Sequence, residues 1–152
     1  MENKEWIREN NSTSAKEATT SSGYAPVAVK QRPRIVIADD DPGVLDEIGN
    51  LLGTTFDVVG RASNGRELLE TVRRLNPAVV VADLAMPEVD GIKAAREITT
   101  TCCNVKVMIL SGYTDESLVE AAFEAGASGY VVKIRACMEL IPAIQCVLGI
   151  PH

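Results

Sequence analysis

From residue 34 onward, the chain alternates short apolar runs with segments whose apolar residues recur at helical spacing. The apolar runs cover residues 34–39, 56–62, 78–83, 105–111 and 128–133. The helical segments cover residues 44–53, 65–75, 90–99, 114–127 and 137–148. Strands that alternate with helices predict a parallel sheet covered by helices on both faces. The sequence therefore predicts an α/β fold.

Five such units predict a three-layer sandwich with the flavodoxin-like strand order 2-1-3-4-5, a (βα)5 arrangement. In sheets of this kind, ligands bind outside the carboxyl ends of the strands, where the strand order reverses. The run AVVVAD (78–83) is apolar on both faces, as a central strand should be, yet it ends in an aspartate. The residues at the strand ends are therefore the candidates for chemistry.

Residues 1–33 differ in composition from the rest of the chain. They are rich in Ser, Thr and Ala and show no apolar period, which predicts a disordered N-terminal extension. We expect one domain over residues 34–148 and a short tail at 149–152. The first 34 residues hold six basic and four acidic side chains, and the remainder holds nine basic and seventeen acidic ones. A domain with a formal charge of −8 is not expected to bind nucleic acid directly.

The composition also bears on location. No run of 18 or more apolar residues occurs, so the sequence predicts no membrane span. The cysteines match neither a CxxC pair nor a zinc framework; they are Cys102, Cys103, Cys137 and Cys146. This pattern favours reduced thiols in a cytoplasmic protein.

Acidic and polar residues stand where the predicted strands end. These are Asp39, Asp40 and Asp41 after the first strand, Asp83 after the third, Ser111 after the fourth and Lys133 after the fifth. Carboxylates crowded into one cleft repel one another, and a small set of oxygen ligands suits Mg2+. Asp83 is then a candidate carboxylate nucleophile, with Lys133 and Ser111 as contacts for the oxygens of a transferred phosphoryl group. Asp41 before Pro42 is a typical helix N-cap, which leaves Asp39 and Asp40 for the metal.

Four stretches of the chain, taken in order, resemble a known family. IVIADDDP, VVVADLAMPEVDG, VMILSGY and GASGYVVK look like the signature stretches of the response-regulator receiver domain. The likeness covers residues 34 to about 148, and the DLxMPxxDG pattern around Asp83 is its most specific part. The last helix, MELIPAIQCVLG, looks most like that of receivers that usually carry a C-terminal helix-turn-helix domain.

The resemblance implies a phosphoacceptor and a metal site. Asp83 would accept the phosphoryl group from a sensor histidine kinase or a phosphotransfer protein. Asp39, Asp40, Asp83 and the backbone carbonyl of Ala85 would hold Mg2+. The chain would then be a self-catalysed switch in a phosphorelay, and not an enzyme that acts on a separate substrate.

The resemblance also implies how the switch works. Ser111 and Lys133 would contact the phosphoryl group, and Tyr130 would turn inward as the hydroxyl of Ser111 moves. The change would alter a protein-interaction face that binds a downstream partner, and the family makes a homodimer plausible.

Three residues depart from the family pattern. Ile134 follows Lys133 where many members have a proline and a cis peptide bond, and a cis bond before a non-proline residue costs several kcal/mol. Gly112 stands where alanine is usual. Pro142 falls within the last helical segment and should kink that helix or lie near its first turns.

Other readings of the chain lead to different functions. Only four residues follow residue 148, which leaves a single-domain regulator or a truncated receiver of a DNA-binding transcriptional regulator. We expect the single-domain regulator, because the N-terminal extension is retained, and keep the truncated receiver as the alternative. A degenerate receiver that acts only as a docking module would not need the intact acidic site. Neither strand end shows the DxDxT pattern of haloacid-dehalogenase phosphatases. The loops of flavin-binding and cobalamin-binding modules are also absent from the sequence.

Overall fold

The computed structural model describes residues 31–150. The predicted disordered extension lies outside the described residues except at its last three positions. The strands are β1 (Arg34–Ala38), β2 (Asp57–Ala62), β3 (Val79–Asp83), β4 (Lys106–Ser111) and β5 (Gly129–Val132). The helices are α2 (Pro42–Leu52), α3 (Gly65–Leu75), α4 (Gly91–Thr101), α5 (Glu116–Glu124) and α6 (Ala136–Leu148), with a 3-10 turn, η2 (Lys133–Arg135), before α6.

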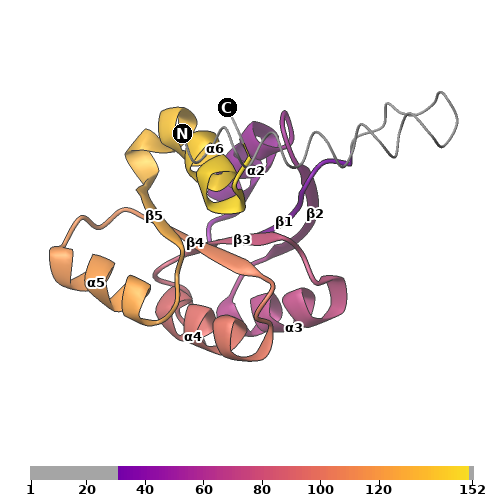
Figure 1. Ribbon diagram of the computed structural model, residues 1–152. Coiled ribbons are helices and arrows are strands. Elements are labelled where there is room, and N and C mark those ends of the chain that lie inside the picture. Colours follow the sequence, from indigo (N-terminus) through magenta and orange to yellow (C-terminus); the bar gives the residue numbers. More distant parts are fainter. Residues whose placement is uncertain (1–30, 151–152) are drawn as a thin grey trace, which may run out of the picture.

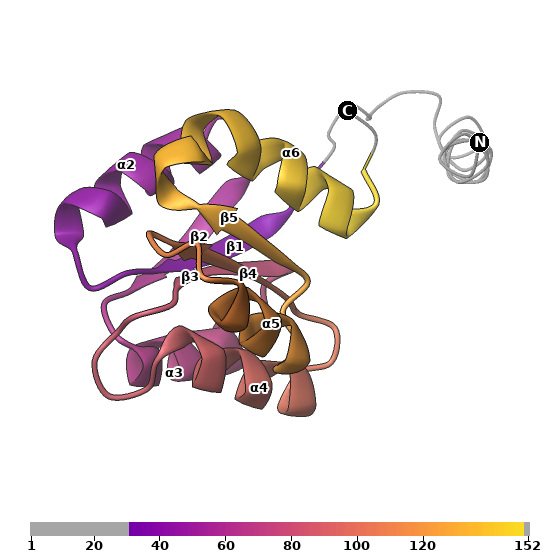
Figure 2. The same cartoon turned by 90° about the vertical axis from the view of Figure 1, so that its left-hand side faces the viewer.

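The five strands form one sheet in the order β2-β1-β3-β4-β5, and every neighbouring pair is parallel. This order confirms the predicted flavodoxin-like arrangement. Helices α2 and α6 cover one face of the sheet, and α3, α4 and α5 cover the other (Figures 1 and 2). The chain is therefore the three-layer sandwich that the alternation of strands and helices predicts.

Both faces of the sheet are apolar, which explains why its strands are nearly continuous apolar runs. Successive side chains of a strand point to opposite faces, so β3 contributes to two separate cores. Val80 and Ala82 belong to the cluster beneath α3, α4 and α5. Val79 and Val81 belong to the cluster beneath α2 and α6. The central strands are thereby held on both faces, and their carboxyl ends form a fixed edge.

Three helices begin at that edge with a capping side chain. Asp41 Oδ1 accepts a hydrogen bond from the Gly43 N–H at 2.9 Å, which confirms its predicted role as the cap of α2. Asn64 caps α3 and Asp90 caps α4 in the same manner, each at 2.8 Å. Asp115 stands at the N-cap of α5 but makes no capping hydrogen bond through its side chain. The first turns of α2, α3 and α4 are therefore fixed beside the strand ends.

Helix α6 continues through Pro142, its seventh residue. The ring removes the N–H that would bond to the carbonyl of Met138, four residues earlier. Pro142 and Met138 are both exposed, so water can hydrate the freed carbonyl. The proline therefore lies beyond the first turn, and α6 tolerates it because it stands on the solvent side of the helix.

Among residues 31–150, no helix is long and apolar enough to span a bilayer.

Candidate functional site

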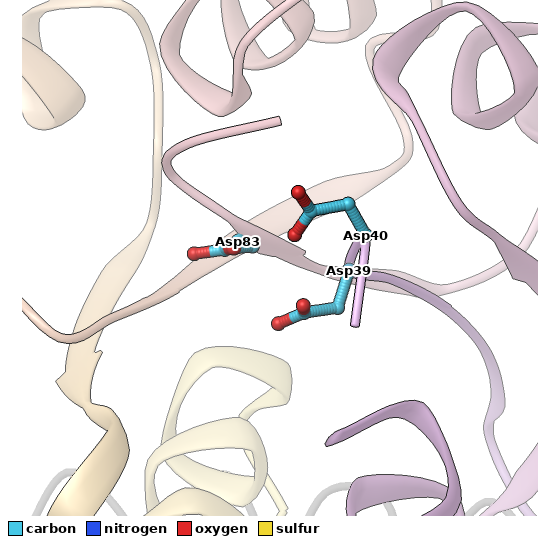
Figure 3. A group of neighbouring side chains, drawn as sticks. All are labelled: Asp39, Asp40 and Asp83. Atoms are coloured by element: carbon cyan, nitrogen blue, oxygen red, sulfur yellow. The ribbon is translucent and has the colours of Figure 1, made fainter. Parts of the chain in front are cut away.

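The acidic site forms where β1 and β3 end side by side. The register pairs Ala38 with Ala82, so the next residues, Asp39 and Asp83, are neighbours across the two strands. Asp40 follows Asp39, and Figure 3 shows the three carboxylates gathered beyond the strand ends. One carboxylate oxygen of each residue lies within 4.8 Å of the others. Asp39 and Asp83 are buried, and Asp40 is exposed. The structure therefore brings together the three carboxylates that the sequence singles out.

Lys133 supplies a positive charge to this cluster. It is the first residue after β5, and its Nζ lies 2.9 Å from Oδ2 of Asp39 and 3.3 Å from Oδ2 of Asp83. One ammonium group faces three carboxylates, so the cluster keeps an excess of negative charge. A site of this kind attracts a further cation.

The pKa values of the two central groups reflect the crowding. Burial raises the pKa of Asp83 above its usual value, and the charge of Asp39 raises it further, although Lys133 and the backbone N–H of Ala85 act in the opposite direction. Burial lowers the pKa of Lys133, but its contacts with Asp39 and Asp83 outweigh burial and leave that pKa raised. Both shifts have the same physical origin, which is that one ammonium group compensates the negative charge of two buried carboxylates only in part.

The donor set fits Mg2+. All of the candidate side-chain ligands are carboxylate oxygens, which hard divalent cations prefer. Oδ2 of Asp39 is buried and lies 2.9 Å from Nζ of Lys133, which also contacts Asp83. Buried carboxylate oxygens cost free energy unless cations or donors approach them, and this one ammonium group is shared between two of them. Ala85, the fourth proposed ligand residue, is exposed and lies two residues after Asp83.

Ser111 and Tyr130 both form hydrogen bonds with the backbone of Tyr113. Ser111 ends β4 and is fully buried, and its Oγ accepts a hydrogen bond from the Tyr113 N–H at 3.0 Å. Tyr130, on β5, donates its hydroxyl to the Tyr113 carbonyl at 2.8 Å. The two predicted switch residues therefore hold the same residue of the loop that leads into α5.

The departures from the family pattern have simple local outcomes. The backbone of residues 31–150 contains no cis peptide bond, so Lys133 and Ile134 are joined in trans. A Cβ added to Gly112 would meet no atom within 4 Å, so this glycine leaves open space beside Ser111. Neither departure moves Lys133 or Ser111 away from the carboxyl edge of the sheet.

Two glycines near the site stand at positions where a side chain would collide with the backbone of a neighbouring segment. A Cβ on Gly91 would collide with the carbonyl oxygen of Asp83, so only glycine lets α4 begin this close to the candidate phosphoacceptor. A Cβ on Gly65 would collide with the carbonyl oxygen of Val89 in the loop after Asp83. The signal that could have found Gly65 is the Asn-Gly pair that follows β2 at this same edge.

The comparisons with known proteins agree with this geometry. The family model of the response regulator receiver domain matches residues 35–145, and the chain belongs to that family. The chain is therefore a receiver of two-component regulatory systems, a signalling switch and not an enzyme in the usual sense.

The curated relatives are transcriptional regulators. The transcriptional regulatory protein LnrK of Bacillus subtilis is 34% identical over 116 residues, which cover 75% of this chain and 53% of LnrK. The transcriptional regulatory protein PdtaR of Mycobacterium tuberculosis is 34% identical over 113 residues, or 74% of this chain and 55% of PdtaR. The chain thus spans about half the length of the curated relatives that it matches.

Solved receivers share the fold over most of the chain. The receiver domain of the putative response regulator NarL from Mycobacterium tuberculosis superposes with a TM-score of 0.75 and 27% identity, covering 79% of this chain and 99% of that one. The isolated receiver of RcsB from Salmonella enterica, studied with the phosphomimetic BeF3−, gives a TM-score of 0.72 and 25% identity, covering 78% of this chain and 89% of that one.

Proposed function

We propose that this receiver accepts a phosphoryl group on Asp83 from a phosphohistidine of a sensor histidine kinase or a phosphotransfer protein. Asp39, Asp40, Asp83 and the carbonyl of Ala85 would hold Mg2+. The observation that carries the proposal is the contact of a single ammonium group, that of Lys133, with two buried carboxylates at the carboxyl edge of the sheet. The proposal places the chain in the cytoplasm, with a receiver domain over residues 34–148.

The transfer is a displacement at phosphorus. A carboxylate oxygen of Asp83 forms the new P–O bond while the P–N bond of the phosphohistidine breaks, and the bonding electron pair stays on the imidazole nitrogen of the donor. Mg2+, when bound, neutralises part of the negative charge that the carboxylate and the phosphoryl group bring together. Lys133 lies within reach of Asp83 and can pair with a phosphoryl oxygen. Water later attacks the phosphorus, the P–O bond to Asp83 breaks, and inorganic phosphate leaves while Asp83 returns to a carboxylate.

Tyr113 links the phosphoryl site to α5. In the described structure, Ser111 Oγ accepts from the Tyr113 N–H and Tyr130 donates to the Tyr113 carbonyl. A phosphoryl group on Asp83 would accept a hydrogen bond from the Ser111 hydroxyl, and hydrogen bonds to ionised groups are about twice as strong as neutral ones. When Ser111 changes rotamer to donate that bond, its Oγ leaves the Tyr113 N–H, and Tyr113 loses one of its two hydrogen bonds. The loop before α5 can then rearrange, and the face made by α5, β5 and α6 presents a different surface to a downstream protein.

An apolar surface beside Lys133 suits the approach of a donor protein. Ile134 is 85% exposed and directly follows the lysine that touches Asp83, and Met138, five positions after that lysine, is 78% exposed. A protein that brings its phosphohistidine to Asp83 has to cover the mouth of the site. We propose that Ile134 and Met138 form part of the surface that it covers.

A second candidate function follows from the lengths of the relatives. LnrK and PdtaR are transcriptional regulatory proteins about twice as long as the matched region. The second candidate is the receiver half of a transcriptional regulator, whose output would come from a DNA-binding domain. The acidic receiver itself would still not bind DNA.

Intact mass spectrometry tests the phosphorylation. The purified chain would be incubated with acetyl phosphate and Mg2+, next to Asp83→Asn and to Asp57→Asn, an exposed aspartate at the start of β2. We expect one phosphate on the wild type and on Asp57→Asn, and none on Asp83→Asn or without Mg2+. An unmodified wild type that also shows no thermal shift with beryllofluoride would overturn the proposal and leave a docking module with a receiver fold.

A further inference from the structure

The loop that follows Asp83 rests on the first turn of α3. This loop, residues 84–90, connects β3 to α4 and includes Ala85. The Gly65 N–H donates to the Pro87 carbonyl at 3.4 Å. Next to it, Nε of Arg66 lies 3.0 Å from Oε1 of Glu88. The loop is therefore supported by a helix that follows β2, a strand that supplies none of the residues predicted for the site.

Gly65 is the point at which the loop and the helix approach most closely. A Cβ at this position would collide with the carbonyl oxygen of Val89 and would lie 2.5 Å from the Cβ of Val89. The carbonyl oxygen belongs to the backbone, so no change of rotamer can make room for it. Any side chain at position 65 must push the loop away from α3.

The loop needs such support because its backbone is strained. Glu88 has a φ of 69°, in the left-handed region. That conformation costs a residue with a Cβ about 1–2 kcal/mol. Strained residues persist where the surrounding structure over-determines their conformation. Gly65 and Arg66 hold this loop on one side, and on the other side the Gly91 N–H donates to the Leu84 carbonyl at 2.8 Å.

We propose that Gly65 is a positioning residue for the Mg2+ site. By letting the loop rest on α3, it fixes Ala85, whose carbonyl is a proposed ligand, beside Asp83. The carboxylate ligands follow the ends of β1 and β3 and are fixed by the sheet, whereas Ala85 lies within the loop: its N–H bonds to Asp83, but the position of its carbonyl depends on the path of the loop. The inference rests on the proposed function, because it assigns Gly65 a part in binding the metal of that function.

The test has to separate metal positioning from a general need for glycine. Gly126→Ala is a matched control. Gly126 has a φ of 109°, and a Cβ there would collide with the side chain of Thr99. It lies between α5 and β5, at the sheet edge opposite to the acidic site. Both Gly65→Ala and Gly126→Ala should lose stability, but only Gly65→Ala should disturb the metal.

Titration calorimetry with Mg2+, on the full chain of each variant, gives the decisive measurement. We expect Gly65→Ala to raise the Kd for Mg2+ by about tenfold, the usual loss when a residue that supports a ligand is changed. Gly126→Ala should keep the wild-type Kd while its urea midpoint falls. A Gly65→Ala variant that folds and binds Mg2+ as tightly as Gly126→Ala would overturn the inference. A wild type that binds no Mg2+ would instead overturn the proposed function.

A second pair of variants keeps the test open if Gly65→Ala does not fold. Arg66→Ala removes the ion pair to Glu88 at the loop, and Arg73→Ala removes the pair to Glu97 further along α3, where Nη2 and Oε2 are 2.6 Å apart. Exposed pairs of this kind contribute little, so we expect Arg66→Ala to weaken Mg2+ binding by about twofold. Arg73→Ala should leave the Kd unchanged. Equal affinities for the two variants would overturn the inference.

Discussion

Nζ of Lys133 lies closer to Asp39, at 2.9 Å, than to Asp83, at 3.3 Å. The lysine that is expected to pair with the phosphoryl group therefore has its shorter contact with a proposed metal ligand. Lys133 and Mg2+ are both cations that would bind the same carboxylates, so each should weaken the binding of the other. This relationship leads to opposite effects of one substitution on stability and on metal affinity.

Lys133→Met should destabilise the Mg2+-free protein and tighten its Mg2+ binding. Removing the ammonium, which is itself partly exposed, leaves two buried carboxylates uncompensated, and this costs about 1–3 kcal/mol. The same loss removes a repulsion on the incoming metal and should lower the Kd for Mg2+ by about tenfold. Urea unfolding and titration calorimetry would measure the two effects. Lys106→Met makes the same charge change at the start of β4 and should alter neither; weaker Mg2+ binding in Lys133→Met would contradict the prediction.

Asp83→Asn should make the Mg2+-free protein more stable at neutral pH. Burial and the charge of Asp39 raise the pKa of Asp83 in the folded state above its usual value, so the folded protein binds this proton more tightly than the unfolded chain does. The stability contribution of the protonated group is fully present below the unfolded pKa, and it is lost as pH rises through the folded pKa. The amide of Asp83→Asn does not ionise, so the variant does not lose this stability as the pH rises. The variant should therefore exceed the wild type in unfolding free energy at pH 7.

Urea unfolding from pH 3.5 to pH 7 in the presence of a chelator measures this difference. The advantage of Asp83→Asn should shrink as the pH approaches the unfolded pKa of the aspartate. Asp57→Asn, at an exposed aspartate, is the control for the loss of one negative charge. A stability advantage that is constant over this pH range would show that the titration of Asp83 does not cause it.

Tyr130→Phe should separate phosphorylation from its effect on α5. The substitution removes the hydrogen bond to the Tyr113 carbonyl and leaves the acidic site untouched. We expect unchanged Mg2+ affinity and unchanged labelling by acetyl phosphate, with a loss of about 1 kcal/mol in stability. Amide hydrogen exchange in residues 112–118 should be faster in the variant and should respond less to beryllofluoride. A full beryllofluoride response would show that the hydroxyl of Tyr130 is not part of the switch.

The sequence predicts the fold and the acidic cluster for the same physical reason. Buried parallel strands are apolar on both faces, so a carboxylate such as Asp83 stands out at a strand end and its place on the sheet follows from the strand order. Contacts made through backbone atoms leave no such pattern. Tyr113 binds Ser111 and Tyr130 with its N–H and carbonyl, and any residue has these groups. Gly65 meets Val89 across 24 positions of sequence, a contact that no helical or strand period encodes.

Ile134→Ser and Met138→Ser should slow phosphoryl transfer from a protein donor but not from acetyl phosphate. Each change removes an exposed apolar group next to Lys133 and leaves the acidic site intact, so only a donor that covers this surface should be affected. Loss of a well-buried apolar contact typically costs 1–3 kcal/mol at an interface, which corresponds to a transfer rate lower by about tenfold. Transfer from a purified phosphorylated histidine kinase would be followed by radiolabel. Phe123→Ser, an exposed apolar residue on α5, is the control, and an equal slowing in that variant would place the donor surface elsewhere.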